Sequence, residues 1–336
     1  MKQFWSHTMK KIYLTNDLGK KEVEDKWKGK FLDDTSYNEV FTITEDTGIM
    51  RPGVSLDGSD VPLGYFITNA YDDNDLIRNT LMSITDVSTM RANASGPILE
   101  EDMLKKGLVK DVDYKLRTEN SYYVKTKSGK WGMIAYGNEI HSIMIGYKRG
   151  RFTGTIDKSG WCNDNPDKWE KLQTLPLWNE RAYEKANPEM FNRQKTWVKT
   201  HIKEEHRING SIVTTMSANK YNAAQSRAMS AHLDSGDYAD GFSTMAVFRD
   251  GDFSGALLTF PQYGIAVDIP DGTCALFDSN TLHGVTPIKG EGTRHSITAY
   301  TDTRLATIGA GRSIKSENPI GHHHRDKKGN LEAFFA

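Results

Sequence analysis

Short β-rich runs, separated by residues that form tight turns, fill the stretch from Phe242 to Phe277, and no other feature constrains the fold as strongly. The runs cover 242–248, 256–260, 265–267 and 274–277, and we expect a turn at each interruption, the first at Arg249–Asp252. This spacing is typical of antiparallel strands joined by short turns. Such strands usually close into a barrel or jelly roll. The sequence therefore predicts a core of this kind.

Three potential metal ligands border this β-rich stretch. His232 and Asp234 precede it and lie two residues apart, so on an extended segment they point to the same face. His283 follows the stretch, on a different expected strand. Two histidines and one carboxylate form the facial triad typical of non-haem iron(II) sites, which leaves about three coordination positions open. A structural zinc site would instead close all its positions, so the set predicts a metal that does chemistry.

A basic and a hydroxyl side chain follow the third ligand. Arg294 and Ser296 are again two residues apart, next to an expected strand from Ser296 to Tyr300. They would share one face, where a guanidinium and a hydroxyl can hold a carboxylate, the arginine through two parallel hydrogen bonds. His295 should point away from that face. The pattern predicts an anion clamp beside the metal.

The order His-x-Asp, His and Arg-x-Ser resembles that of the 2-oxoglutarate and iron(II)-dependent dioxygenases, which are built on a double-stranded β-helix. Further segments narrow the resemblance to the TET/JBP family of DNA 5-methylpyrimidine hydroxylases, particularly its viral and microbial members: Arg91–Pro97, Ile143–Tyr147, Asn219–Asn222, Gly241–Met245 and Phe253–Asp268. The likeness covers roughly residues 80–305 and does not reach the first sixty.

The resemblance implies a fold, two cofactors and a set of site residues. The fold would be α+β, a double-stranded β-helix (jelly-roll) dioxygenase core with flanking helices. Iron(II) would be bound by His232, Asp234 and His283, and the distal carboxylate of 2-oxoglutarate by Arg294 and Ser296. The remaining candidates are Asn219 and Tyr221 as further contacts of 2-oxoglutarate, and Arg91, Asn93 and Asn222 as substrate-binding residues.

Three parts of the chain are expected from these patterns. Residues 1–60 would form an N-terminal extension, bounded by a turn-rich connector at 51–64. Residues 61–310 would form the dioxygenase domain, with the metal core at 211–305, and 311–336 a polar C-terminal tail. A hairpin is expected around Tyr122 to Ile134 and a helix from Phe191 to Glu205. We expect no functional role for His322–His324 in the tail.

Overall charge does not indicate a nucleic-acid partner, because 43 Lys and Arg balance 44 Asp and Glu. Between Lys105 and Lys158, however, twelve basic residues face only five acidic ones, with several aromatic residues among them. Basic and aromatic side chains are what backbone contact and base stacking use. A solvated face of a sheet would look the same. With the resemblance, the pattern favours DNA containing a 5-methylpyrimidine as the partner.

The cellular compartment can be predicted from the cysteine number, the N-terminal sequence and the length of the apolar runs. Two cysteines give no disulfide framework, and an iron(II) enzyme suits a reducing interior. The N-terminus has no signal-peptide pattern, and no apolar run approaches the ~20 residues of a membrane span. We expect a cytoplasmic protein, in the host cytoplasm if it is viral, with no membrane association and no obligate protein partner.

The resemblance implies hydroxylation of the 5-methyl group of a flipped pyrimidine in DNA, consuming 2-oxoglutarate and dioxygen, with 5-methylcytosine as the preferred base. Three alternatives stay open at this point. The same chemistry could act on thymine in DNA, or on a protein side chain or small molecule. The barrel could also bind metal or nucleic acid without turnover, although a complete triad and clamp argue against that.

Overall fold

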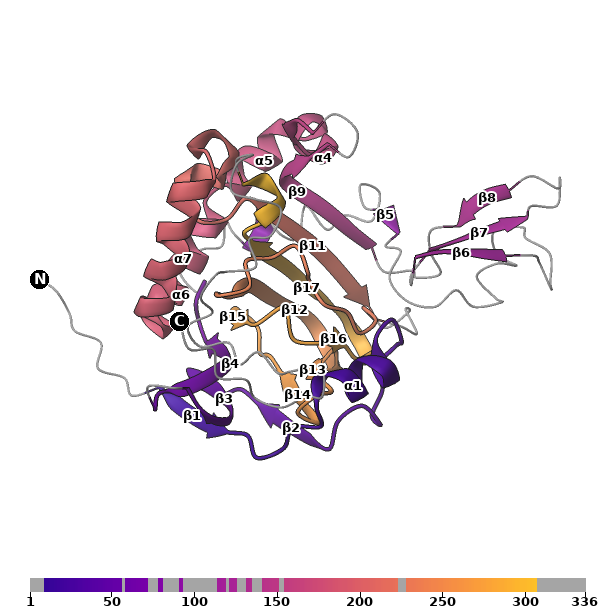
Figure 1. Cartoon of the computed structure of the whole chain (residues 1–336), viewed down its shortest axis with the longest axis vertical. Coiled ribbons are helices and arrows are strands. Elements are labelled where there is room, and N and C mark those ends of the chain that lie inside the picture. Colours follow the sequence, from indigo (N-terminus) through magenta and orange to yellow (C-terminus); the bar gives the residue numbers. More distant parts are fainter. Residues whose placement is uncertain are drawn as a thin grey trace, which may run out of the picture.

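The computed structural model describes residues 9–55, 58–71, 78–80, 91–92, 114–118, 121–125, 131–134, 141–150, 154–222 and 228–306. Over these ranges the chain forms two main β-sheets, with helices on the outer face of the larger one (Figure 1). None of the helices in these ranges is long and apolar enough to cross a membrane.

The larger sheet has ten strands drawn from the whole length of the described chain. In spatial order its main path is β1 (Lys10–Tyr13), β3 (Thr47–Val54), β4 (Asp60–Ile67), β15 (Thr273–Phe277), β12 (Ser243–Gly255), β17 (Ile288–Tyr300), β11 (Thr215–Asn222), β9 (His141–Arg149) and β10 (Ile156–Lys158), and β5 (Arg91–Ala92) pairs with β9. The central pairings from β4 to β9 are antiparallel.

The smaller sheet has four strands, in the order β16 (Gly284–Val285), β13 (Leu258–Phe260), β14 (Ile265–Asp268) and β2 (Glu39–Thr42). A separate sheet consists of β6 (Tyr114–Thr118), β7 (Ser121–Lys125) and β8 (Trp131–Ile134). Since β7 and β8 pair antiparallel, the hairpin predicted around Tyr122 to Ile134 is confirmed.

Apolar side chains alternate between the two faces of the central strands, so a hydrophobic core forms on each face of the larger sheet. On β12 and β15, Met245, Val247, Ala275 and Phe277 face the smaller sheet and pack with its apolar residues. Their neighbours Ala246, Phe248, Cys274 and Leu276 belong to the core beneath the helices. Residues one apart on a strand point to opposite faces, so each strand serves both cores.

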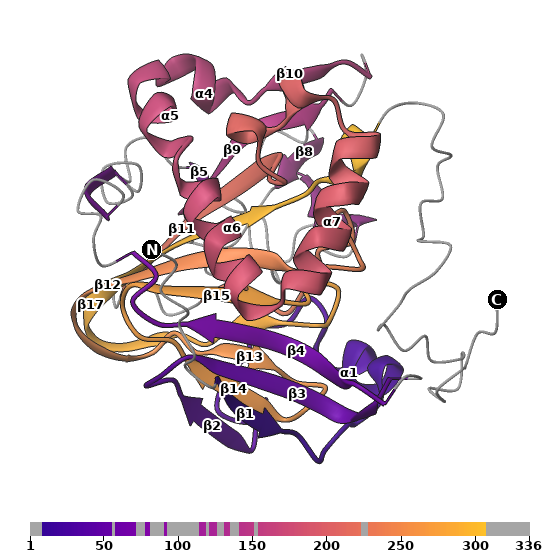
Figure 2. The same ribbon diagram turned by 90° about the vertical axis from the view of Figure 1, so that its left-hand side faces the viewer.

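Helices cover the outer face of the larger sheet, as Figure 2 shows for α6 (Leu175–Ala186) and α7 (Pro188–His201). The shorter helices are α4 (Gly160–Asp164), α5 (Pro166–Leu172) and, before the strands of the smaller sheet, α1 (Lys20–Trp27), with 3-10 turns η2 (Glu204–His206), η3 (Ile208–Gly210) and η4 (Thr303–Leu305). The helix predicted from Phe191 to Glu205 ends earlier, at His201, because Ile202 takes an extended conformation and is buried.

Two expectations from local patterns meet a different outcome. The turn predicted at Arg249–Asp252 is wrong, because β12 continues through it and pairs with β17 as far as Gly255. Gly251 allows this with a φ of 81° that other residues adopt rarely. The connector at 51–64 includes the β3–β4 hairpin of the larger sheet, and the residues expected to form an N-terminal extension supply strands to both sheets.

Candidate active site

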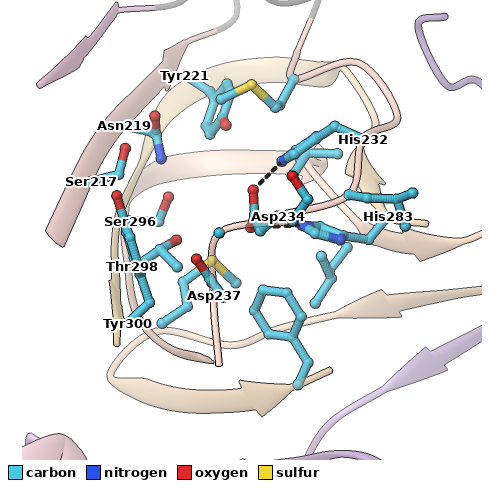
Figure 3. Close-up of a pocket in the computed structure, with 18 of the residues that line it drawn as sticks. Ser217, Asn219, Tyr221, His232, Asp234, Asp237, His283, Ser296, Thr298 and Tyr300 are labelled. Atoms are coloured by element: carbon cyan, nitrogen blue, oxygen red, sulfur yellow. Dashed lines mark ion pairs between the residues drawn. The ribbon is translucent and has the colours of Figure 1, made fainter. Parts of the chain in front are cut away.

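The two histidines of the predicted triad face each other across a short antiparallel bridge (Figure 3). The backbone N–H of His232 donates to the carbonyl of His283 at 2.8 Å, and the reverse bond measures 3.1 Å. Directly opposed residues of such a pair have their side chains on the same side. The ring centroids accordingly lie 4.5 Å apart.

Asp234 lies two residues beyond His232 and points at both rings. Its Oδ1 is 3.6 Å from Nε2 of His232, and its Oδ2 is 3.6 Å from Nε2 of His283. One donor atom from each of the three residues lies within 4.8 Å of the others, close enough for a single ion to contact all three. The structure thus brings together the three residues that the sequence predicted as metal ligands.

Hydrogen bonds fix the orientation of both imidazoles. Nδ1 of His232 lies 2.7 Å from the carbonyl oxygen of Ser230, and Nδ1 of His283 lies 2.9 Å from that of Thr281. A carbonyl oxygen only accepts, so each Nδ1 carries the hydrogen and each Nε2 presents its lone pair to the centre. Burial, with a smaller effect of His232, lowers the pKa of His283 to about 4. The ring is therefore neutral at pH 7, as a metal ligand must be.

The triad opens into a cavity of about 430 Å³ between the two sheets. Its polar wall is made by two paired strands, on which alternate residues point inward: Ser217 opposite Thr298, Asn219 opposite Ser296, and Tyr221 opposite Arg294. Its apolar wall includes Met245, Leu258, Phe277 and Val285. The cavity has room for an organic acid beside a metal ion.

Arg294 is 1% exposed. Its guanidinium donates to Ser296 Oγ at 3.2 Å and approaches Met245 Sδ at 3.7 Å, and it lies 5.7 Å from the ring centre of Tyr221. Within the described residues no carboxylate forms an ion pair with it. Burial, the largest effect, lowers the pKa of Arg294 to about 10, so the group is still charged at pH 7.

A buried charge without a counter-ion is unfavourable. The cavity therefore suits an anion at Arg294, and a carboxylate is the group whose geometry a guanidinium matches best. Asn219 lies on the same wall and offers a side-chain NH2 that can donate to such a carboxylate, while its buried Oδ1 has no hydrogen-bond partner in the described part of the chain. The donor set fits both groups that the sequence predicted, a metal at the triad and a dicarboxylic acid beside it.

One acidic residue of the cavity was not identified from the sequence. Asp237 accepts hydrogen bonds from the hydroxyls of Ser243 and, at 3.0 Å, Ser279. Burial, and then the charge of Asp234, raises the pKa of Asp237 well above the usual range. Its only sequence signal was the acidic segment 235–240, which has no periodicity that would single out one residue.

The remaining residues predicted from the sequence point away from the cavity or have side chains outside the described part of the structure. Asn222 does not line the cavity, since it alternates away from Tyr221. Arg91 lies on β5, opposite Ser142, and nothing is described of its side chain; Asn93 lies outside the described residues. His295 points away from the clamp, as predicted, and is buried there, 4% exposed. The tail histidines and much of the basic stretch before Lys158 also lie outside the described residues.

This chain is similar to known proteins in both sequence and fold. Residues 146–303 match the Tet_JBP family model, described as the oxygenase domain of the 2OGFeDO superfamily. Thymine dioxygenase JBP1 of Trypanosoma brucei brucei is 23% identical over 168 residues, which cover 50% of this chain and 18% of that protein. Thymine dioxygenase JBP1 of Crithidia fasciculata is 28% identical over 127 residues, 38% of this chain and 14% of that protein. The chain thus spans less than a fifth of these relatives.

Among solved structures, one described as NgTET1 in complex with 5mC DNA superimposes with a TM-score of 0.50 at 12% identity. The match covers 86% of this chain and 89% of that one. At this identity the likeness concerns the fold. Together with the family match it confirms the predicted architecture, a double-stranded β-helix with flanking helices.

Proposed function

We propose that this chain, whose residues 146–303 match the Tet_JBP family model of 2OGFeDO oxygenases, is a 2-oxoglutarate- and iron(II)-dependent dioxygenase that hydroxylates the 5-methyl group of a pyrimidine in DNA. The observation that carries the proposal is one cavity holding both a convergent triad and the buried guanidinium of Arg294, which no carboxylate of the described chain neutralises. The family implies iron(II) and 2-oxoglutarate, and these two features are suited to bind them.

The triad would hold iron(II) through Nε2 of both histidines and the carboxylate of Asp234. When bound, iron together with 2-oxoglutarate and dioxygen supplies the oxidising power that hydroxylates a C–H bond, while 2-oxoglutarate becomes succinate and carbon dioxide. The protein contributes the fixed direction of the ligands. The carbonyls of Ser230 and Thr281 keep both rings turned inward, and such outer contacts sustain metal affinity.

Arg294 and Ser296 would take the distal carboxylate of 2-oxoglutarate. The guanidinium already donates to the serine hydroxyl, so both groups can turn toward one anion. Asn219 lies on the paired strand opposite Ser296, and its amide can complete the site. The ring of Tyr221 lies next to the guanidinium and would bound the carboxylate site on that side. The co-substrate would thus lie along the polar wall, with its other end directed to the triad.

The substrate would occupy the part of the cavity lined by Asp237 and Tyr300, away from Tyr221 in Figure 3. The 5-methyl group of a pyrimidine projects into the major groove, where an enclosed metal cannot reach it. The nucleotide must therefore be flipped out, at a cost of a few kcal/mol of unstacking. A carboxyl group that keeps its proton, as burial favours for Asp237, can both donate and accept along the Watson–Crick edge of the base.

We favour 5-methylcytosine as the base, because the fold match to NgTET1, whose structure is described as a complex with 5mC DNA, extends over 86% of this chain. Thymine is the second candidate, favoured by the sequence matches to thymine dioxygenases. Both bases carry the same methyl group, so the triad itself cannot discriminate between them. Selection would come from hydrogen bonds to the edge of the flipped base.

The test is mass spectrometry of nucleosides after incubation of the protein with iron(II), 2-oxoglutarate and DNA that contains both bases. We expect 5-hydroxymethylcytosine, in amounts that match the succinate released, and no product with the Asp234→Ala variant. Formation of 5-hydroxymethyluracil alone would replace the first candidate by the second. Succinate release without a modified base would contradict the DNA substrate and favour a protein or small-molecule substrate.

A further inference from the structure

The β3–β4 hairpin, which precedes the family-matched residues 146–303, contacts the turn that leads into the second histidine. The carbonyl of Leu63 accepts from the backbone N–H of Asp278 at 3.1 Å. Arg51 reaches the same turn with its side chain, forming an ion pair with Asp278 and donating to Thr281 Oγ1 at 3.0 Å. The side chains of Arg51 and Asp278 are only 12% and 4% exposed.

The turn at 278–281 is closed around the carboxylate of Asp278. That carboxylate accepts from the backbone N–H of Asn280 at 2.9 Å and from the hydroxyl of Thr281 at 3.0 Å. The N–H of Thr281 also donates to the carbonyl of Asp278 at 3.1 Å. Arg51 therefore binds two side chains that together define the shape of the turn.

This turn supports two of the three metal ligands. The carbonyl of Thr281 accepts the Nδ1 hydrogen of His283 at 2.9 Å. The carbonyl of Ser279 accepts the backbone N–H of Asp234 at 2.9 Å. A displacement of the turn would therefore move the imidazole and the carboxylate relative to each other, and a metal site is sensitive to such shifts.

Arg51 is also what balances the charge at the turn. Burial tends to lower the pKa of Arg51, but Tyr263 and Asp278 beside it outweigh burial, so that the pKa is raised and the side chain stays charged. Without the guanidinium, Asp278 would be a buried carboxylate that has lost its ion-pair partner. Such a group is strongly unfavourable, and it would take up a proton or turn toward solvent.

We infer that Arg51 is a positioning residue for the metal centre, holding His283 and Asp234 in place through the Asp278–Thr281 turn. The inference rests on the proposed function in that it takes the triad to be the metal site. It gives the N-terminal hairpin a role in the chemistry of a site whose ligands all lie in the C-terminal half of the chain.

The test uses the full-length chain and Co(II), a spectroscopic substitute for iron(II), titrated without oxygen and followed by visible absorption. Arg51→Ala should raise the Co(II) dissociation constant ~10- to 100-fold, the range typical of lost outer contacts of metal ligands. It should also change the Co(II) spectrum at saturation, which a purely structural role would leave unchanged. Arg51→Lys, which keeps the charge but not the planar fork, should restore the affinity in part.

Two further variants control for stability. Arg51→Met combined with Asp278→Asn removes both charges together, so no buried charge is left unpaired and the chain should fold even if Arg51→Ala does not. We expect its Co(II) affinity to fall as well. Arg78→Ala removes a more exposed ion pair, 2.6 Å from Asp271, at a turn that does not touch the ligands. Its Co(II) affinity and spectrum should match those of the wild type.

Failure of the inference about Arg51 and failure of the metal-site assignment give different results. If Arg51→Ala or the double variant binds Co(II) with wild-type affinity and spectrum, the inference is wrong while the metal site stands. If the wild type binds no Co(II), or if binding survives His232→Ala, the triad is not the metal site and the inference falls with it.

Discussion

At the scale of single residues, the site is defined by what each side chain can accept or donate once it is buried. His232 and His283 each donate through Nδ1 to a backbone carbonyl, which leaves Nε2 available to a metal. Arg294 keeps a positive charge in a cavity where the described chain offers it no carboxylate. The first arrangement is suited to a cation and the second to an anion, and both line the same cavity.

Replacing Arg294 tests the second arrangement. Arg294→Ala should raise the 2-oxoglutarate concentration needed for half-maximal succinate release by ~10- to 150-fold, because a charge-assisted hydrogen bond contributes about 1.5–3 kcal/mol. The free protein should not lose thermal stability through the lost charge, since Arg294 has no counter-ion among the described residues. Arg294→Lys should recover only part of the affinity. An unchanged 2-oxoglutarate requirement would show that the carboxylate binds elsewhere.

The ligands and the clamp could be predicted from the sequence because their chemistry is encoded by residue type and a spacing of two. Asp237 could not be, because it lies in an acidic loop where several residues would serve equally well. Arg51 could not be either, since the ion pair joins residues 227 positions apart. Its role depends on a pairing of distant strands that no local pattern contains.

At the scale of elements, helix α7 braces the loop that follows the first two ligands. Gln194 of α7 is 2% exposed, accepts from the hydroxyl of Tyr183 at 3.0 Å and donates to Thr301 Oγ1 at 3.1 Å. The Tyr183 hydroxyl in turn accepts from the backbone N–H of Phe242, and the carbonyl of Thr301 accepts from that of Tyr238. The two ends of the segment 238–242 are therefore both connected to the buried side-chain amide of Gln194, one through Tyr183 and the other through Thr301.

Removing that amide should destabilise the fold. Gln194→Ala removes the acceptor of the buried Tyr183 hydroxyl and the donor to Thr301 Oγ1, which costs about 1–3 kcal/mol for each group that is not satisfied again. Thermal denaturation followed by circular dichroism should show a clearly lower midpoint. Thr196→Ala, an exposed position on the same helix, should change stability by no more than ~0.5 kcal/mol. Equal midpoints for the two variants would contradict the bracing role.

Elements whose sequence signals act over a few positions could be predicted, whereas elements that depend on pairing between distant strands could not. The β7–β8 hairpin and the runs within 256–277 follow alternation and turn residues, which act over a few positions. The predicted turn at Arg249–Asp252 failed because β17 offers twelve paired positions to β12, and this ladder outweighs the local Asp-Gly signal. Helix α7 ended before its predicted boundary because burial of Ile202 favoured an extended backbone.

At the scale of the whole molecule, the N-terminal strands extend one edge of each sheet (Figure 1). Strand β1 pairs parallel with β3, and β2 pairs parallel with β14. The backbone of Lys30 and Gly29 also pairs with Ala231, the residue before the first ligand. The β2–β14 pairing and the contacts with Ala231 join segments about 200 residues or more apart, so no local pattern predicts that residues 10–60 pack beside the site.

The central claim is that one cavity holds a metal at the triad and 2-oxoglutarate at Arg294. A crystal structure grown without oxygen in the presence of Mn(II) and 2-oxoglutarate tests it directly, by anomalous diffraction at the manganese edge. The account predicts an anomalous peak about 2.0–2.3 Å from Nε2 of His232, Nε2 of His283 and the carboxylate of Asp234, with the distal carboxylate of 2-oxoglutarate on Arg294. A peak elsewhere, or a co-substrate carboxylate bound away from Arg294, would contradict it.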